Sequence, residues 1–397
     1  MIKLNKIVMI VKNESNFKIT TDRMKNSRNF SFIHASDIHL GSNQYRNTYR
    51  ADDFIRAFDE ILKLAIYHCV DFILLGGDVF TSLEILPEKL NTIVSIIKKF
   101  INITKGTIPI IAIEGNHDIR KYSRGTRVNH GQSWLKFIAN LGLIILLDGN
   151  INDPPEKLYP LYDFKSNYGG KVRIKSAMIY GNGYLGENPE EFFPKIRAAI
   201  QKDDGLFHIL LQHFGIHGQM ECVPGVEFKQ LILLKDRVDY LALGHYHLQF
   251  MLDNWIYNPG SSEAACSVDF SYKRGIFLVK VSWDKKFIKK VYIIRLNNRR
   301  YVWSTINFKT EFKDKAKLNE YIIQRLKHIL KDLRCNLNPS NPNMPMLLLL
   351  LKGKNPLNSH KINEKELSKK ISETIPVVGV RIYQKFENNL KTIDTFF

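Results

Sequence analysis

Ile113-Glu114-Gly115-Asn116-His117-Asp118 is the stretch around which the rest of the sequence can be interpreted. It follows the apolar run 108–112, which predicts a buried strand. Gly115 allows a sharp turn, so the next side chains are expected at the carboxyl end of that strand, where open α/β sheets bind ligands. Asn116 offers a neutral oxygen to a hard metal, and His117 offers a nitrogen that titrates near pH 7. Asp118 can orient the imidazole ring, although a capped turn alone would also explain these residues.

Four further predicted strands end in the same way, with Asp or His. Asp37 and His39 follow the strand 30–34, Asp78 follows 71–75, His213 follows 207–211, and His245 and His247 follow 240–243. Within each close pair the two residues lie two positions apart, so an extended backbone would turn both side chains to one side. Packing alone does not explain why all these strands end in Asp, Asn or His. His217 lies further into its loop and is expected to be exposed or to support a ligand.

Carboxylate, imidazole and amide ligands together suit Mn²⁺, Fe²⁺ or Zn²⁺, and the share of oxygen ligands favours Mn²⁺. Two sites with four ligands each require one shared residue, and a carboxylate can bridge two cations. A metal pair about 3.5–4 Å apart clamps a phosphate and lowers the pKa of a bridging water, which gives hydroxide for in-line attack. The sequence therefore predicts two Mn²⁺ ions per chain, with other divalent metals as alternatives. Such chemistry needs no serine or cysteine nucleophile.

The 397 residues are 44% hydrophobic and carry a formal charge of +19, which predicts two ordered domains and an acidic polymer or surface as partner. A lysine-rich organism with a solvated basic surface is the alternative. The excess lies at the ends: residues 1–29 hold seven Lys and Arg against two acids, and residues 299–397 hold nineteen against nine. We therefore expect a basic N-terminal arm (1–29), either mobile or forming one short strand, a catalytic domain (30–298) and a smaller domain (299–397).

The cysteines and the hydropathy indicate the compartment. Cys69, Cys222, Cys266 and Cys335 form no CxxC pair, so we expect them to be reduced and the protein to be cytoplasmic. No apolar run reaches the roughly 20 residues that span a bilayer.

Two segments interleave cations with aromatic or polar residues, as nucleic-acid-binding surfaces do. The first contains Gln44, Tyr45 and Arg46, and an ordinary polar loop explains it equally well. The second, predicted as a basic loop, contains Arg120, Lys121, Arg124 and Arg127. Helices are expected at 54–65, 87–100, 131–141 and 188–201. Residues 276–281 and 289–295 are expected to form an antiparallel pair of strands. Beyond residue 299 the pattern predicts a βαβαβ unit with strands 301–308, 346–351 and 377–383 and helices 315–333 and 364–374.

The motifs Asp37-Ile38-His39, Gly76-Gly77-Asp78, Gly115-Asn116-His117-Asp118, His213 and Gly244-His245-Tyr246-His247 resemble those of calcineurin-like metallophosphoesterases. More narrowly, the chain is similar to the Mre-eleven/SbcD nucleases of DNA double-strand-break repair. This match rests on residues 34–41, the basic segment after Asp118, Asn258-Pro259-Gly260-Ser261 and the unit after residue 299. The resemblance implies a two-sheet α/β/β/α sandwich with a smaller C-terminal α/β capping domain that binds DNA.

The resemblance also implies a ligand set. One metal would take Asp37, His39, Asp78 and His247, and the other Asp78, Asn116, His213 and His245, with Asp78 bridging. His117 would bind no metal; it would face the scissile phosphate and stabilise or protonate the leaving oxygen. Phe214 stands where the family usually has glutamine after its histidine.

Activity and partners follow from the same resemblance. The family is a Mn²⁺-dependent DNA exonuclease and endonuclease, commonly a homodimer, and it works with a Rad-fifty-like ABC ATPase docked on helices beyond the cap. This chain ends at Phe397 without evident docking helices, and a nucleoid-associated location is expected.

Two other functions fit parts of the pattern. A small-molecule phosphodiesterase would share the metal motifs, but the positive charge and the basic segments argue against it. A non-catalytic DNA-binding subunit on a decayed phosphoesterase fold would usually lack ligands, and every expected ligand is present.

Overall fold

The computed structural model describes residues 10–13, 16–19, 28–123, 126–221, 223–266, 268–331, 338–357 and 362–387. The chain divides into two compact units. The larger unit comprises Met1–Ser42 and Phe54–Leu296, and the smaller unit comprises Asn43–Asp53 and Asn297–Phe397. The smaller unit therefore includes a segment from early in the sequence, which the charge distribution gave no reason to expect. Among the described helices, none is long and apolar enough to cross a membrane.

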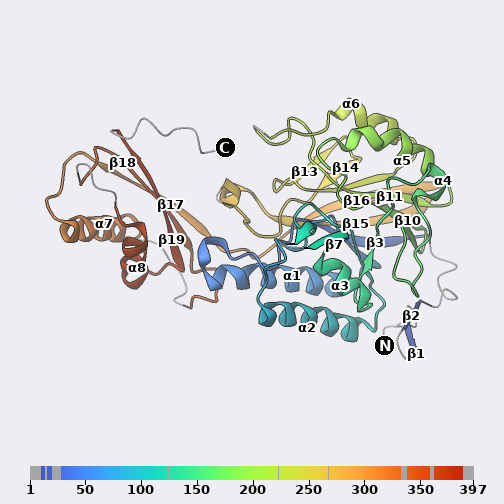
Figure 1. The fold of residues 1–397 in the computed structure, drawn as a ribbon, viewed down its shortest axis with the longest axis horizontal. Helices are drawn as coiled ribbons and strands as arrows, with labels where there is room; N and C mark the ends of the chain where they lie inside the picture. The colour runs from blue at the N-terminus through green and yellow to red at the C-terminus, as the bar shows by residue number, and fades with distance from the viewer. Residues whose placement is uncertain are drawn as a thin grey trace. The chain divides into compact units, whose positions relative to one another are not determined.

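Two six-stranded sheets form the larger unit (Figure 1). The first has the order β16 (Lys286–Arg295), β15 (Gly275–Asp284), β3 (Phe30–Ala35), β4 (Phe72–Leu75), β5 (Ile110–Ala112) and β8 (Ile145–Leu146). The second has the order β13 (Phe250–Leu252), β14 (Ile256–Asn258), β12 (Tyr240–Gly244), β11 (Phe207–His213), β10 (Ala177–Gly181) and β9 (Lys171–Ile174).

The two sheets pack face to face, because alternate residues of each strand point into a shared apolar core. Phe32 and Phe72 of the first sheet meet Ile209 and Tyr240 of the second in this core. On the outer face of the first sheet lie α1 (Thr48–Tyr67), α2 (Pro87–Thr104) and α3 (Trp134–Asn140). The outer face of the second carries α5 (Phe193–Ala199) and α6 (Phe228–Leu231). The α/β/β/α sandwich is thus confirmed.

Parallel pairing brings the carboxyl ends of the central strands to the same edges. In the first sheet β3, β4, β5 and β8 run parallel, and in the second β10, β11, β12 and β14 do. These parallel strands are almost wholly buried, which is why they appear in the sequence as continuous apolar runs and not as alternating patterns. Strands β15 and β16 form the predicted antiparallel pair.

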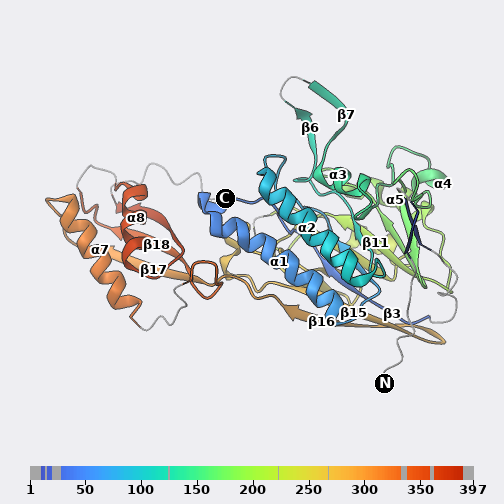
Figure 2. The ribbon, with the colours of Figure 1, turned by 90° about the horizontal axis from the view of Figure 1, so that it is seen from below.

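Several elements differ from the predictions. The basic segment after residue 119 is a hairpin of β6 (Arg120–Ser123) and β7 (Thr126–Gln132), not a loop, and it projects beyond α3 in Figure 2. Helix α3 begins later than predicted because the Ser133 hydroxyl caps it, accepting hydrogen bonds from the N–H groups of Leu135 (3.1 Å) and Lys136 (3.3 Å).

Further short elements were not expected from the sequence. The predicted helix 188–201 is a 3-10 turn, η3 (Pro189–Phe192), followed by α5. Helix α4 (Pro155–Leu158) lies in a predicted loop, and η2 (Gln44–Arg46), η4 (Ile232–Leu234) and η5 (Val268–Ser271) are short 3-10 turns. Within the N-terminal arm, β1 (Ile10–Asn13) pairs with β2 (Asn16–Ile19), so it contains two strands rather than one; most of the arm lies outside the described residues.

The smaller unit has the predicted βαβαβ order. Its parallel sheet consists of β17 (Tyr301–Phe308), β18 (Met346–Gly353) and β19 (Gly379–Phe386), with β18 in the centre. Helices α7 (Lys315–Ile329) and α8 (Glu364–Thr374) pack on one face. The core between helices and sheet includes Leu347, Leu349 and Ile382 from the strands and Ile322 and Ile371 from the helices.

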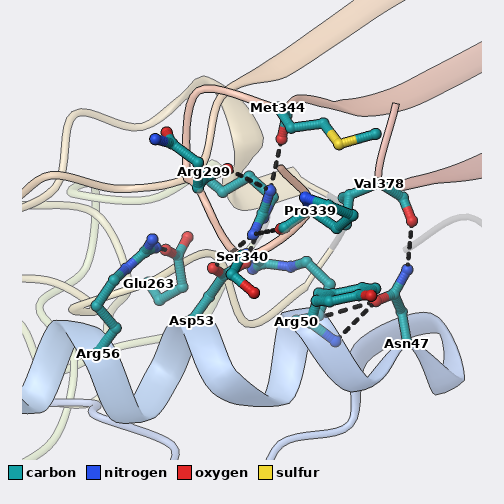
Figure 3. Close-up of polar contacts among 12 residues, drawn as sticks. Asn47, Arg50, Asp53, Arg56, Glu263, Arg299, Pro339, Ser340, Met344 and Val378 are labelled. Carbon is teal, nitrogen blue, oxygen red and sulfur yellow. Dashed lines mark hydrogen bonds and ion pairs between the residues drawn. The ribbon is translucent and has the colours of Figure 1, made fainter. Parts of the chain in front are cut away.

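A buried ion network explains why residues 43–53 belong to the smaller unit (Figure 3). The Asp53 carboxylate accepts hydrogen bonds from Arg50 Nη1 (2.6 Å) and from Arg299 Nε (2.5 Å) and Nη2 (3.0 Å). All three side chains are at most 2% exposed. The Arg299 guanidinium also donates to the carbonyl oxygens of Met344 (2.5 Å) and Pro339 (2.8 Å). One arginine thereby joins three parts of the sequence within this unit.

Asp53→Ala is expected to lower the free energy of unfolding by about 3–5 kcal/mol, because it leaves two buried guanidinium groups without their carboxylate. Denaturant unfolding followed by circular dichroism measures this. Glu320→Ala, which removes an exposed carboxylate from α7 of the same unit, is the control. A loss below about 1 kcal/mol, the range of surface pairs, would show that the network contributes little to stability.

Candidate metal centre

The structure brings the residues singled out at the strand ends to one edge of the sandwich. Asp37 and His39 follow β3, Asp78 follows β4, Asn116 and His117 follow β5, His213 ends β11, and His245 and His247 follow β12. Backbone hydrogen bonds hold the loops together: the N–H groups of Asp37 and His39 donate to the carbonyl oxygens of Gly77 and Asp78, at 3.0 Å each. Both sheets thus contribute side chains to one site.

These side chains form two groups with spacings that suit metal coordination. Asp37, His39 and His247 have ligand atoms within 4.8 Å of one another, and so have Asp78, His213 and His245. In the first group, the Nε2 atoms of His39 and His247 are 3.0 Å apart. Bonds of about 2.1 Å to a cation place neighbouring ligand atoms roughly 3 Å apart.

The second group has similar spacings. Asn116 Oδ1 is 3.1 Å from His213 Nε2 and 3.2 Å from His245 Nδ1. Asp78 Oδ2 is 3.3 Å from His213 Nε2. His213 Nδ1 donates to the carbonyl oxygen of Gly76 at 2.8 Å, which turns Nε2 toward these oxygens. The donors of both groups therefore fit a pair of divalent cations.

The electrostatics also favour positive charge at this place. Burial lowers the pKa of His213, but the charge of Asp78 and the hydrogen bond to it raise that pKa to about 9. A proton on His213 thus neutralises Asp78 where a cation would otherwise lie. The pKa of His39 falls to about 3 through burial and the neighbouring His247, and burial and the charge on His213 lower the pKa of His245 to about 4. Both imidazoles are therefore neutral, the form that binds metal.

The loops that carry the ligands are tightly packed. A Cβ atom on Gly115 would lie 2.1 Å from Asp78 Oδ1 and 2.4 Å from the Asp78 backbone nitrogen, so only glycine fits there. Asp37, His39, Asp78 and His245 have φ angles of 50°, 52°, 49° and 95°, in the left-handed region. Backbone strain of this kind is characteristic of functional sites.

These φ angles contradict the expectation that an extended backbone turns the two residues of each close pair to the same side. The backbone at Asp37 and His39 is not extended; left-handed kinks, rather than strand alternation, bring both side chains to the first group. His245 and His247 do not share a group, because His245 lies with the second and His247 with the first.

His117 lies at the exposed rim of the site. Its Nδ1 donates to the carbonyl oxygen of Thr81 at 3.1 Å, which leaves Nε2 as the nitrogen available to a substrate. Its ring meets that of His39 edge to face, with centroids 5.2 Å apart. The expectation that Asp118 orients this ring is wrong. Asp118 instead accepts from the N–H groups of Val79 (3.2 Å), Phe80 (2.7 Å) and Gly115 (2.9 Å), and so ties the loops after β4 and β5 together.

Asp269, in η5, supports His247 and was not identified from the sequence. Its buried carboxylate accepts from His247 Nδ1 at 2.7 Å, from the N–H groups of Ala265 and Cys266 at 3.0 Å each, and from Cys266 Sγ at 2.9 Å. A proton held on Nδ1 directs Nε2 toward His39 and makes the imidazole a stronger ligand. No periodicity or motif marks this acid, since it lies in a single short 3-10 turn after the last motif. Asp269 is thus a positioning residue.

Asp269→Ala is expected to weaken binding of Mn²⁺ by about 10–100-fold, the usual effect of losing such a partner. Calorimetric titration of metal-free protein with Mn²⁺ measures the affinity directly. Ser271→Ala, which removes an exposed hydroxyl from the same turn, should leave it unchanged. Asp269→Asn keeps an oxygen acceptor in the turn and should give an intermediate value; wild-type affinity in both Asp269 variants would contradict the positioning role.

The residues predicted to contact nucleic acid are arranged differently from one another. Gln44 Oε1 accepts hydrogen bonds from Arg50 Nε (3.0 Å) and the Tyr301 hydroxyl (2.8 Å). Tyr45 is half-buried within the smaller unit. Arg46 is exposed. The hairpin β6–β7 carries Arg120, Lys121 and Arg127, and Arg124 lies outside the described residues. His217 is exposed, as expected, 3.9 Å from Glu227.

Residues 30–249 match the model of the calcineurin-like phosphoesterases, and the chain belongs to this family. Within it, the chain is similar to proteins named DNA double-strand break repair protein Mre11. It is 25% identical to that of Saccharolobus solfataricus over 91% of this chain and 84% of the relative. It is 34% identical to that of Halobacterium salinarum over 68% and 61%, and 27% to that of Archaeoglobus fulgidus over 58% and 50%. Both levels of the resemblance seen in the motifs are confirmed.

Proposed function

We propose that this chain is a Mn²⁺-dependent DNA nuclease, with exonuclease and endonuclease activity, that processes DNA ends in double-strand-break repair. The observation that carries the proposal is the gathering of seven ligand side chains from five strand ends, with His117 exposed beside them. The relatives named as Mre11 repair proteins support DNA as the substrate. The charge of +19 supports a polyanion over a small phosphodiester with a single negative charge.

The proposed ligand sets are Asp37, His39, Asp78 and His247 for one cation, and Asp78, Asn116, His213 and His245 for the other. When bound, two divalent cations neutralise the phosphate and activate water for attack on phosphorus. The Thr81 carbonyl holds the His117 ring by Nδ1, so Nε2 can hold the proton that the leaving oxygen needs. Asp269 and the Gly76 carbonyl keep His247 and His213 in the tautomers that present Nε2.

Further parts of the proposal rest on the family resemblance. The smaller unit would act as a DNA-binding cap, the chain would form a homodimer, and a Rad-fifty-like ABC ATPase would be its partner. Contacts to the DNA backbone are proposed for Arg46 and for the hairpin β6–β7 with its cationic residues.

A nuclease assay tests the proposal. Purified protein is incubated with end-labelled linear duplex DNA in Mn²⁺, in Mg²⁺ and in a chelator, with closed circular single-stranded DNA to detect internal cleavage. Degradation of the duplex in Mn²⁺ that stops with the chelator is the expected result. Rapid hydrolysis of a small nucleotide diester beside an intact duplex would favour a small-molecule phosphodiesterase. A protein that binds DNA but purifies and remains without metal would be a non-catalytic subunit.

A further inference from the structure

The sheet of the smaller unit has one face covered by α7 and α8 and a second face with a different composition. The parallel register places three rows of side chains on this second face. These rows are Trp303–Leu348–Arg381, Thr305–Leu350–Tyr383 and Asn307–Lys352–Lys385. We refer to these nine residues as the open face. Their neighbours in sequence, such as Leu347, Leu349 and Ile382, point into the core beneath the helices.

Two aromatic rings lie across the centre of the open face. Trp303 of β17 and Tyr383 of β19 have ring centroids 5.9 Å apart and planes inclined by 22°, a stacked arrangement. Leu348, on the strand between them, is fully buried, whereas Trp303 is 46% exposed. The Arg381 guanidinium lies 5.6 Å from the centre of the Tyr383 ring. Part of the indole in this stack is therefore accessible to solvent.

The charges on the open face have one sign. Lys352, Arg381 and Lys385 are exposed, and none of the nine residues is acidic. Thr305 and Asn307 are also exposed and supply hydrogen-bonding groups. A ligand that fits must therefore combine negative charge with flat rings.

We propose that the open face binds single-stranded DNA, with bases stacked on Trp303 and Tyr383 and phosphates near Lys352, Arg381 and Lys385. Aromatic side chains on a cationic surface bind unpaired bases without regard to sequence, because every base has a π-face. The bases of a duplex are stacked on one another and cannot reach such a surface. The charges disfavour an apolar protein partner. This inference deepens the proposed function and rests on it for DNA as the nucleic acid.

Binding is measured with the full chain in a chelator, so that no cleavage occurs, by fluorescence anisotropy with a labelled oligothymidylate of about 12 nucleotides. The double variant Trp303→Ala/Tyr383→Ala is expected to bind this strand at least about 10-fold more weakly than the wild type. Tyr67→Ala removes a 79% exposed ring from α1 in the larger unit and should bind as the wild type does. Trp303→Phe keeps an aromatic ring and should retain most of the affinity.

Further measurements separate the possible failures. Lys352→Ala/Lys385→Ala should lower both the affinity and its dependence on salt. Equal binding of the single strand by the wild type and the aromatic double variant overturns the inference, and so does an equal loss for a duplex of the same length. Circular dichroism identifies a misfolded double variant, in which case Trp303→Leu alone provides the same comparison. If the wild type binds the strand through these rings but hydrolyses no phosphodiester, the proposed nuclease function is wrong, whereas the inference that the open face binds single-stranded DNA is retained.

Discussion

Asp78→Ala is expected to lose both metal ions and nearly all hydrolytic activity. In the proposed site its carboxylate bridges the two cations, so its removal takes a ligand from each. The structure places this carboxylate in the second group: Oδ2 is 3.3 Å from His213 Nε2, and Oδ1 accepts from the His117 backbone N–H at 2.8 Å. The electrostatic influence of Asp78 also reaches His39 in the first group. We expect the loss of metal affinity to exceed the roughly 10–100-fold that is typical when a residue supporting a ligand is removed.

The metal content of the purified variant and its titration with Mn²⁺ measure this effect without reference to activity. Asp236→Ala, which removes an exposed carboxylate paired with Arg197, serves as the control for handling and metal contamination. A variant that still binds one ion with wild-type affinity would show that Asp78 belongs to a single site. In that case another carboxylate, for which Asp37 is the candidate, would have to be shared.

His117→Ala is expected to retain both metals and to lower kcat by about 10²–10⁴-fold, the range for removal of a positioned proton donor. The reason is its location, since the ring is exposed at the rim and its Nδ1 donates to the Thr81 carbonyl oxygen, not to a ligand side chain. The assay compares cleavage of linear duplex DNA at saturating Mn²⁺, together with the metal titration of the same preparation.

His217→Ala is the matched control, because it removes another exposed imidazole from a loop of the same unit. It should cleave DNA at the wild-type rate. Loss of metal from His117→Ala to the same degree as from Asp78→Ala would assign His117 to coordination and leave the proton donor to another group.

The positions of the site residues were predictable because parallel strands obey a simple rule. Buried parallel strands appear as short apolar runs, and their carboxyl ends meet at one edge, so polar residues directly after such runs come together. Asp37, Asp78, Asn116, His213 and His245 follow this rule, although nothing in one strand indicates which sheet it joins.

The remaining features depend on contacts between distant residues, which sequence patterns do not contain. Left-handed backbone at His39 and His245 replaced the expected alternation. Asp118 follows a histidine and was therefore expected to orient it, but its oxygens accept hydrogen bonds from three N–H groups in two loops. Asp269 and the segment 43–53 find their partners far along the chain, as Asp53 does with Arg299. The sequences around Asp269 and in the segment 43–53 have the composition of ordinary loops and helices, so nothing in them indicates these distant partners.

The close approach at Gly115 has a consequence for the evolution of this site. A Cβ at that position would collide with both the side chain and the backbone of Asp78, so the loops after β4 and β5 cannot drift independently. Any substitution at 115 would displace Asp78, the ligand proposed to be shared, even though Gly115 has no side chain that could bind a metal. Selection on the chemistry should therefore preserve a residue that has no chemistry of its own.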